Sequence, residues 1–160
     1  MTSKSQYEYF EARYAEELER VRDLQKKSQV YLSIISIISS IIFVKIYNYN
    51  DLNLQDCISK ILICLFIADL LFILVYLIKS IRVQEYCAVF NPNNYLDEVP
   101  GDQPSYNDDD FYDNRVADFI YAISENQKIN SKKAHSLKIA EYGLFALVII
   151  VLVLFILNLV

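Results

Sequence analysis

The chain has 160 residues with a formal net charge of −5, and 54% of them are hydrophobic. That length suits one domain, and the acidic balance argues against non-specific nucleic-acid binding, which needs a basic surface. The apolar residues gather in three blocks, 30–47, 61–78 and 144–157, whereas a soluble domain spreads them through amphipathic elements. The sequence therefore predicts an all-α integral membrane protein with three transmembrane helices.

Residues 1–29 are polar and charged and lack the apolar core of a signal peptide, so no cleavable signal peptide is expected. They predict a cytoplasmic amphipathic helix. Glu17 interrupts a series of apolar residues that recur three and four positions apart, namely Tyr7, Phe10, Tyr14, Val21 and Leu24. No proline or glycine occurs before Pro92. We therefore expect this helix to run without a break from about Ser5 into the first apolar block.

Residues 30–82 predict a transmembrane hairpin with spans at 30–47 and 58–80, since a spanning helix needs roughly 20 mostly apolar residues. The second span contains Asp69, whose carboxylate costs at least ~2.5 kcal/mol if it faces lipid. Tyr76 and Ser80 share its helix face. The first span has a polar stripe of its own, formed by Gln29, Ser33, Ser36 and Ser40. We expect both polar faces to turn towards a polar interior.

A plainer interpretation of these polar residues stays open. Serine hydroxyls in spanning helices often bond carbonyls of their own helix or allow close helix packing, and Asp69 could pair within the bundle.

Residues 83–109 predict a cytoplasmic loop, because all three prolines and Gly101 lie there. The polar run 107–110 suits a helix start. A cytoplasmic helix is expected at 110–139 and the third transmembrane helix at 140–160. The third span has no polar stripe, so we expect it to face lipid.

Basic residues predict the orientation of the chain. Nine of them flank the ends of the spans that adjoin the N-terminal and 79–140 segments, namely Arg20, Arg22, Lys26, Lys27, Lys79, Arg82, Lys132, Lys133 and Lys138. On the opposite side there are two, Lys45 and Lys60. The positive-inside rule therefore places the N-terminus in the cytoplasm and the C-terminus outside.

A single three-span chain is too small to enclose a pathway, so we expect a symmetric homo-oligomer. The second cytoplasmic helix offers a seam for self-association, formed by Val116, Phe119, Ile123, Asn126 and Asn130. Asn126 and Asn130 either fix the register of that seam or face solvent, and the sequence favours neither.

No catalytic residues, cofactor or metal site are expected, since no triad, phosphate-binding glycine loop or metal-ligand spacing is present. His135 is expected to be a surface residue. The basic residues Arg82, Arg115, Lys128, Lys132 and Lys133 have two explanations, the positive-inside rule and a cytoplasmic anion or nucleotide site between subunits. In the second case Tyr112 and Tyr121 would supply stacking surfaces.

Three stretches carry a resemblance to bacterial antiphage effectors. They are RYAEELERVRDLQKKSQVYLSIISIISSIIF at 13–43, the second span at 61–78, and DFIYAISENQKINSKKAHSLKIAEYGLFALVII at 118–150. The chain resembles the SLATT group, the SMODS- and SLOG-associating two-transmembrane effectors, and is similar to the channel effector of the Hailong system. The third span departs from a plain two-span pattern.

The resemblance implies an oligomeric pore, with a tetramer as one arrangement, in the lipid of the bacterial inner membrane. Such a pore disrupts the membrane potential under control of a nucleotide or oligonucleotide made by a partner nucleotidyltransferase. Two other readings compete with the gated channel: a non-conducting membrane-anchored scaffold and a holin-like lytic protein.

Overall fold

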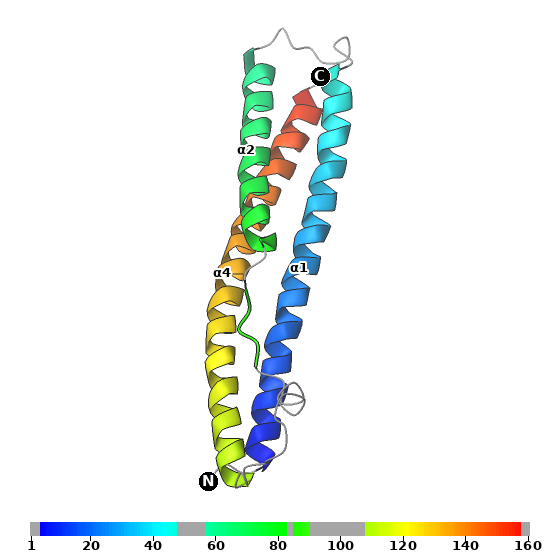
Figure 1. The fold of residues 1–160 in the computed structure, drawn as a ribbon. Helices are drawn as coiled ribbons and strands as arrows, with labels where there is room; N and C mark the ends of the chain where they lie inside the picture. Colours follow the sequence, from blue (N-terminus) through cyan, green and yellow to red (C-terminus); the bar gives the residue numbers. More distant parts are fainter. Residues whose placement is uncertain (1–3, 48–56, 83–84, 90–107, 158–160) are drawn as a thin grey trace, which may run out of the picture. The chain divides into compact units, whose positions relative to one another are not determined.

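The computed structural model describes residues 4–47, 57–82, 85–89 and 108–157, and its elements are helices (Figure 1). These are α1 (Lys4–Tyr47), α2 (Cys57–Ile81) and α4 (Asp108–Leu157). Each of the three is long and apolar enough to cross a membrane. The all-helical class and the number of candidate spanning helices are thereby confirmed.

The two longest helices follow from what their sequences lack. α1 is continuous over 44 residues, which contain no proline or glycine. α4 begins at Asp108, two residues before the predicted start, and its first three residues are aspartates, whose charge favours a helix N-terminus. Residues 90–107, most of the predicted loop, lie outside the described residues, as do 158–160 at the end of the predicted third span. The division of each helix into cytoplasmic and membrane parts stays a prediction.

The chain divides into two compact units. Unit 1 comprises Met1–Arg22 and Val83–Ser131, and unit 2 comprises Asp23–Arg82 and Lys132–Val160. α1 and α4 each contribute residues to both units, whereas α2 belongs to unit 2 alone.

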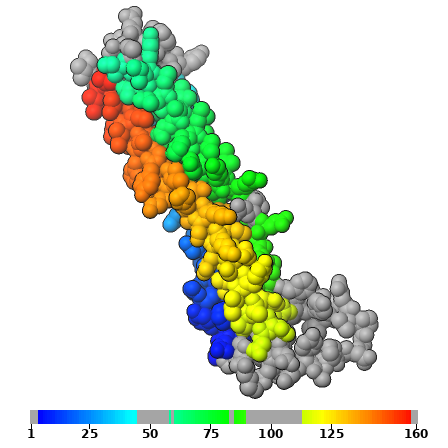
Figure 2. All heavy atoms as spheres, turned by 90° about the vertical axis from the view of Figure 1, so that its left-hand side faces the viewer, coloured from blue at the N-terminus to red at the C-terminus, as the bar shows by residue number. Residues whose placement is uncertain are grey.

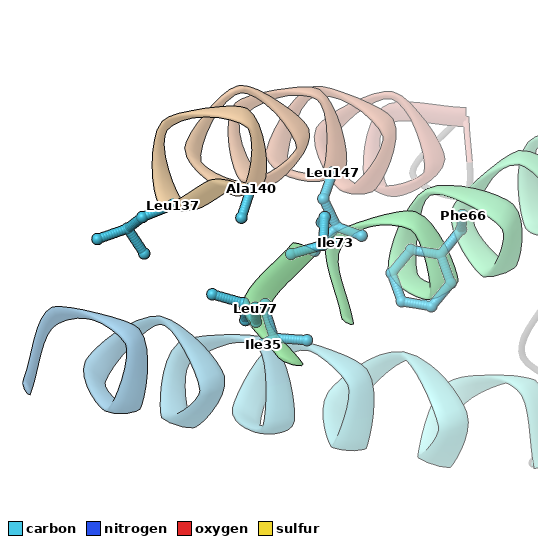
Figure 3. Packing of buried hydrophobic residues seen from close by; sticks show 7 residues of the cluster. All are labelled: Ile35, Phe66, Ile73, Leu77, Leu137, Ala140 and Leu147. Atoms are coloured by element: carbon cyan, nitrogen blue, oxygen red, sulfur yellow. The ribbon is translucent and has the colours of Figure 1, made fainter. Parts of the chain in front are cut away.

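Unit 2 has an apolar core to which all three helices contribute (Figure 3). The buried residues of this cluster are Ile35 from α1, Phe66, Ile73 and Leu77 from α2, and Leu137, Ala140 and Leu147 from α4. α2 and the C-terminal part of α4 lie side by side (Figure 2). The outward faces of the helices are also apolar and exposed in the single chain, as a surface in contact with lipid or other subunits would be.

Unit 1 is a pair of helical segments, one from α1 and one from α4, with residues 85–89 between them (Figure 1). Phe119 is buried and contacts two tyrosines of α1. Its ring centroid lies 5.5 Å from that of Tyr7 and 5.7 Å from that of Tyr14. Three aromatic residues of the apolar series in α1, Tyr7, Phe10 and Tyr14, are half-buried. Val21 of the same series is buried, and so is Glu17, which interrupts the series in sequence.

Candidate functional site

Asp69 lies at the midpoint of α2, twelve residues from either end. Its Oδ2 atom is buried and has no hydrogen-bond partner among the described residues. A buried polar atom without a partner is uncommon in a folded protein, because it gives up its bonds to water without replacement. Within one chain, Asp69 is therefore a site in unit 2 whose hydrogen bonding is incomplete among the described residues.

Gly143 of α4 determines how closely the helix backbone approaches Asp69. A β-carbon at position 143 would lie 2.6 Å from Cγ1 of Ile73 and 3.5 Å from Oδ1 of Asp69. The first distance is too short unless the Ile73 side chain or one of the helices shifts, so the absence of a side chain at Gly143 allows the contact. Asp69 thus faces the backbone of α4 inside one chain.

Tyr76, the predicted companion of Asp69, is half-buried on α2 and packs beside the apolar core. Its ring centroid is 4.8 Å from that of Phe72, and Nζ of Lys79 lies 4.9 Å from it. Its described contacts are thus with apolar and cationic groups.

The predicted serine stripe lies on the exposed face of α1. Ser33, Ser36 and Ser40 donate hydrogen bonds to the carbonyl four residues earlier, at 3.0, 2.8 and 2.7 Å. These hydroxyls therefore bond carbonyls of their own helix, which is the plainer of the two interpretations that the sequence left open. The stripe faces away from the core of a single chain. The neighbouring Ser39 differs, because its Oγ is buried without a hydrogen-bond partner among the described residues.

Two further polar contacts link helices within unit 2. The hydroxyls of Ser28 and Ser80, both buried, lie 3.0 Å apart, and Ser28 Oγ also lies 2.9 Å from the Leu24 carbonyl. The Tyr31 side chain of α1 lies beside the Glu141 carboxylate of α4. The sequence placed Ser80 on the polar face of the second span but indicated no partner for it, because a serine or tyrosine near a span end has no pattern that identifies its partner.

In unit 1 the two asparagines of the predicted seam are completely buried within a single chain, with 0% exposure for both. Nδ2 of Asn130 donates to the Glu17 carboxylate at 2.9 Å and to the Glu17 carbonyl at 3.1 Å. Gln127 Nε2 donates to the other carboxylate oxygen at 3.2 Å. The alternative in which these asparagines face solvent is therefore wrong.

Asn126 binds a peptide backbone rather than a side chain. Its Oδ1 accepts from the Cys87 N–H at 2.9 Å, and its Nδ2 donates to the Cys87 carbonyl at 3.1 Å. One amide side chain thereby pairs with both polar groups of one residue, as a neighbouring strand would.

The rest of the predicted seam also packs inside the chain. Val116 and Phe119 are buried and Ile123 is half-buried. Because these residues and the two asparagines are used within one chain, the seam is complete without a second copy. A contact between subunits through this face has no support from the described residues.

The predicted basic set is not gathered into one site. Arg115 lies 3.9 Å from Asp118, and Lys128 lies 2.6 Å from Glu125, whose carboxylate raises the pKa of that lysine. Arg115 and Lys128 lie thirteen positions apart in α4, about 20 Å along a helix. In unit 2, Lys133 is buried with 2% exposure, whereas Arg82 and Lys132 are exposed.

Aromatic and acidic groups give no further ligand site. Tyr121 is exposed, and the side chain of Tyr112 lies outside the described residues. No group of three or more His, Cys, Asp or Glu residues in the described part of the chain could hold a metal ion.

No family model, curated protein or solved structure matches this chain.

Proposed function

We propose that this protein is a subunit of an oligomeric ion channel whose conduction depends on Asp69. The observation that carries the proposal is the carboxylate at the midpoint of α2, with one buried oxygen that has no hydrogen-bond partner among the described residues. A charged group at the centre of a spanning helix is costly, and such residues mark ion paths or polar centres of assembly.

The serine stripe supports a path between subunits. Ser33, Ser36 and Ser40 point away from the core of one chain, and each hydroxyl oxygen keeps a lone pair while it donates to its own helix. A water-filled path lined by this stripe therefore lies between copies. This arrangement favours a homo-oligomer, for which a tetramer is one solution.

The orientation belongs to the same proposal, with the N-terminus in the cytoplasm and the C-terminus outside the bacterial inner membrane. A membrane-impermeant maleimide added from outside should label Cys57 and not Cys87, with single-cysteine variants identifying each thiol. Labelling of Cys87 alone would reverse the topology.

The biological role follows from the resemblance to SLATT-type and Hailong effectors. On that basis the channel depolarises the membrane during phage infection, under control of a nucleotide signal from a partner nucleotidyltransferase. A nucleotide that binds Arg115 or Lys128 must displace Asp118 or Glu125. Charge reversal at these two basic residues should abolish binding of a signal that uses them; unchanged binding removes them as sensors.

Ion flux from liposomes tests the channel directly. We would reconstitute the wild type, Asp69→Asn and Asp69→Leu, and measure flux with and without a panel of mono-, di- and oligonucleotides. Asp23→Asn is the matched control, since it removes an exposed carboxylate of α1 that is weakly paired with Lys26 at 3.8 Å. Native mass spectrometry of the same samples reports assembly.

We expect wild-type flux to depend on nucleotide, and both Asp69 variants to lose flux at least about tenfold while the oligomer persists. The control should conduct as the wild type does. An assembled oligomer that never conducts would favour the membrane-anchored scaffold. Flux that survives Asp69→Leu would leave a channel but remove Asp69 from its path.

A further inference from the structure

We propose that residues 85–89 form a releasable strap on unit 1. The strap is docked between the α1 and α4 segments by hydrogen bonds, and it leaves while these helices stay paired. The proposal concerns a conformational step and stands whether or not the protein conducts ions.

The strap is held by polar contacts. Asn126 binds the Cys87 N–H and carbonyl at 2.9 and 3.1 Å, and the Tyr14 hydroxyl donates to the same carbonyl at 3.3 Å. The Tyr86 hydroxyl lies 3.4 Å from Oδ1 of Asn130. Three of these four contacts converge on the backbone of one residue, so a single local opening breaks them together.

The strap's own side chains contribute little to a core. Glu85 and Ala88 are exposed, and Tyr86, Cys87 and Val89 are half-buried. No strap residue is completely buried. Undocking therefore exposes no strap side chain that was completely buried, and burial of such apolar side chains is what normally makes docking permanent.

The pairing of the helices rests on other residues. Val116, Phe119 and Ala122 are buried, and Phe119 contacts Tyr7 and Tyr14 through their rings. The bonds from Asn130 to Glu17 also join α4 to α1 without the strap. These contacts remain when residues 85–89 leave.

The groups freed by release are polar. The Asn126 amide, the Tyr14 hydroxyl and the Cys87 peptide groups can all bond water, so the net loss per hydrogen bond is small. Segments with few buried apolar contacts open locally, at lower free energy than the whole protein. The strap has the properties of such a segment.

Hydrogen exchange at the Cys87 amide tests the strap, because this N–H is bonded to Asn126. We would measure exchange of the full-length protein in lipid nanodiscs by mass spectrometry with fragmentation. The variants are Asn126→Asp, which loses the donor to the Cys87 carbonyl, and Tyr14→Phe, which loses one hydroxyl. Asn114→Asp, the same change at an exposed position of α4, is the control.

In the wild type we expect the Cys87 amide to exchange about 10 to 1,000 times more slowly than an unfolded peptide, and faster than the amides around Asn126 in α4. Asn126→Asp should accelerate Cys87 about three- to tenfold, and Tyr14→Phe about twofold, with α4 unchanged. Asn114→Asp should change nothing.

Three results would overturn the proposal. A wild-type Cys87 amide that exchanges as fast as an unfolded peptide would mean that the strap is not docked. A Cys87 amide that exchanges only together with the α4 amides would mean that the strap is a fixed part of the core. Loss of α4 protection in the Tyr14→Phe protein would lead to the same conclusion.

Discussion

Units 1 and 2 differ in how completely their buried carboxylates are hydrogen-bonded. In unit 1 a carboxylate and two carboxamides are buried, and all three have partners: Glu17, Asn126 and Asn130. In unit 2 the core is made of aliphatic and aromatic side chains, and the carboxylate of Asp69 keeps one buried oxygen without a partner among the described residues. The first arrangement is complete in one chain, whereas the second leaves a polar group for an ion, water or another subunit to satisfy.

The largest effect should come from breaking the complete network of unit 1. Asn130→Leu removes two donors from Glu17 and leaves its carboxylate buried, which should lower the free energy of unfolding by about 2–4 kcal/mol. Chemical denaturation in detergent, followed by circular dichroism, measures this change. Asn114→Leu, at an exposed site of the same helix, is the control.

A double-mutant cycle sharpens that result. Glu17→Leu combined with Asn130→Leu should restore part of the stability, because neither polar group is then left alone. Strict additivity of the two changes would show that the residues do not act as a pair.

The next effect tests the close contact in unit 2. Gly143→Ala places a β-carbon against Ile73 and should cost about 1–3 kcal/mol, because the Ile73 side chain or one of the two helices must shift. The loss should be smaller in an Ile73→Ala background, which removes the clashing atom. Ala146→Val, at an exposed position of α4, should be nearly neutral. Equal losses in both backgrounds would argue against the contact.

A smaller effect is expected at the hydroxyl pair of unit 2. Ser28→Ala leaves the buried Ser80 hydroxyl without its partner and should cost about 0.5–1.5 kcal/mol. Ser33→Ala removes a hydroxyl that bonds only its own helix. The midpoint of thermal unfolding of this variant in detergent should therefore match that of the wild type. A larger loss at Ser33 would reverse this order.

The smallest effect concerns Lys128, whose amine is fully exposed. The Glu125 carboxylate raises its pKa, so the pair's contribution to stability is present at neutral pH and is lost as the pH rises through the raised pKa. Water screens an exposed pair, so Lys128→Met should hardly change the unfolding midpoint at pH 7. A clear drop at pH 7 would give this pair a greater structural role.

The sequence predicted the features that depend on local pattern. The helices follow from apolar periodicity and from the absence of helix breakers before Pro92, and Asp69 is conspicuous as a charge inside an apolar block. Even Glu17 was visible as an interruption of the apolar series.

Partners distant in the chain could not be predicted. Asn126 bonds a residue 39 positions away, and Asn130 one 113 positions away, so no local spacing indicates them. The sequence pattern of an apolar seam with two asparagines is the same whether the seam packs against another subunit or against the same chain. Likewise, the sequence shows that three serines share a helix face, but not whether that face is turned inward.

The amide of Asn126 also has a consequence for solubility. A segment without regular secondary structure, such as 85–89, can pair its backbone donors and acceptors with the same segment of another molecule and start a sheet. Asn126 occupies both groups of Cys87, and Tyr14 shares the carbonyl. With its central residue already paired, the docked segment is a poor template, and protein lacking the Asn126 amide should be the more prone to aggregate.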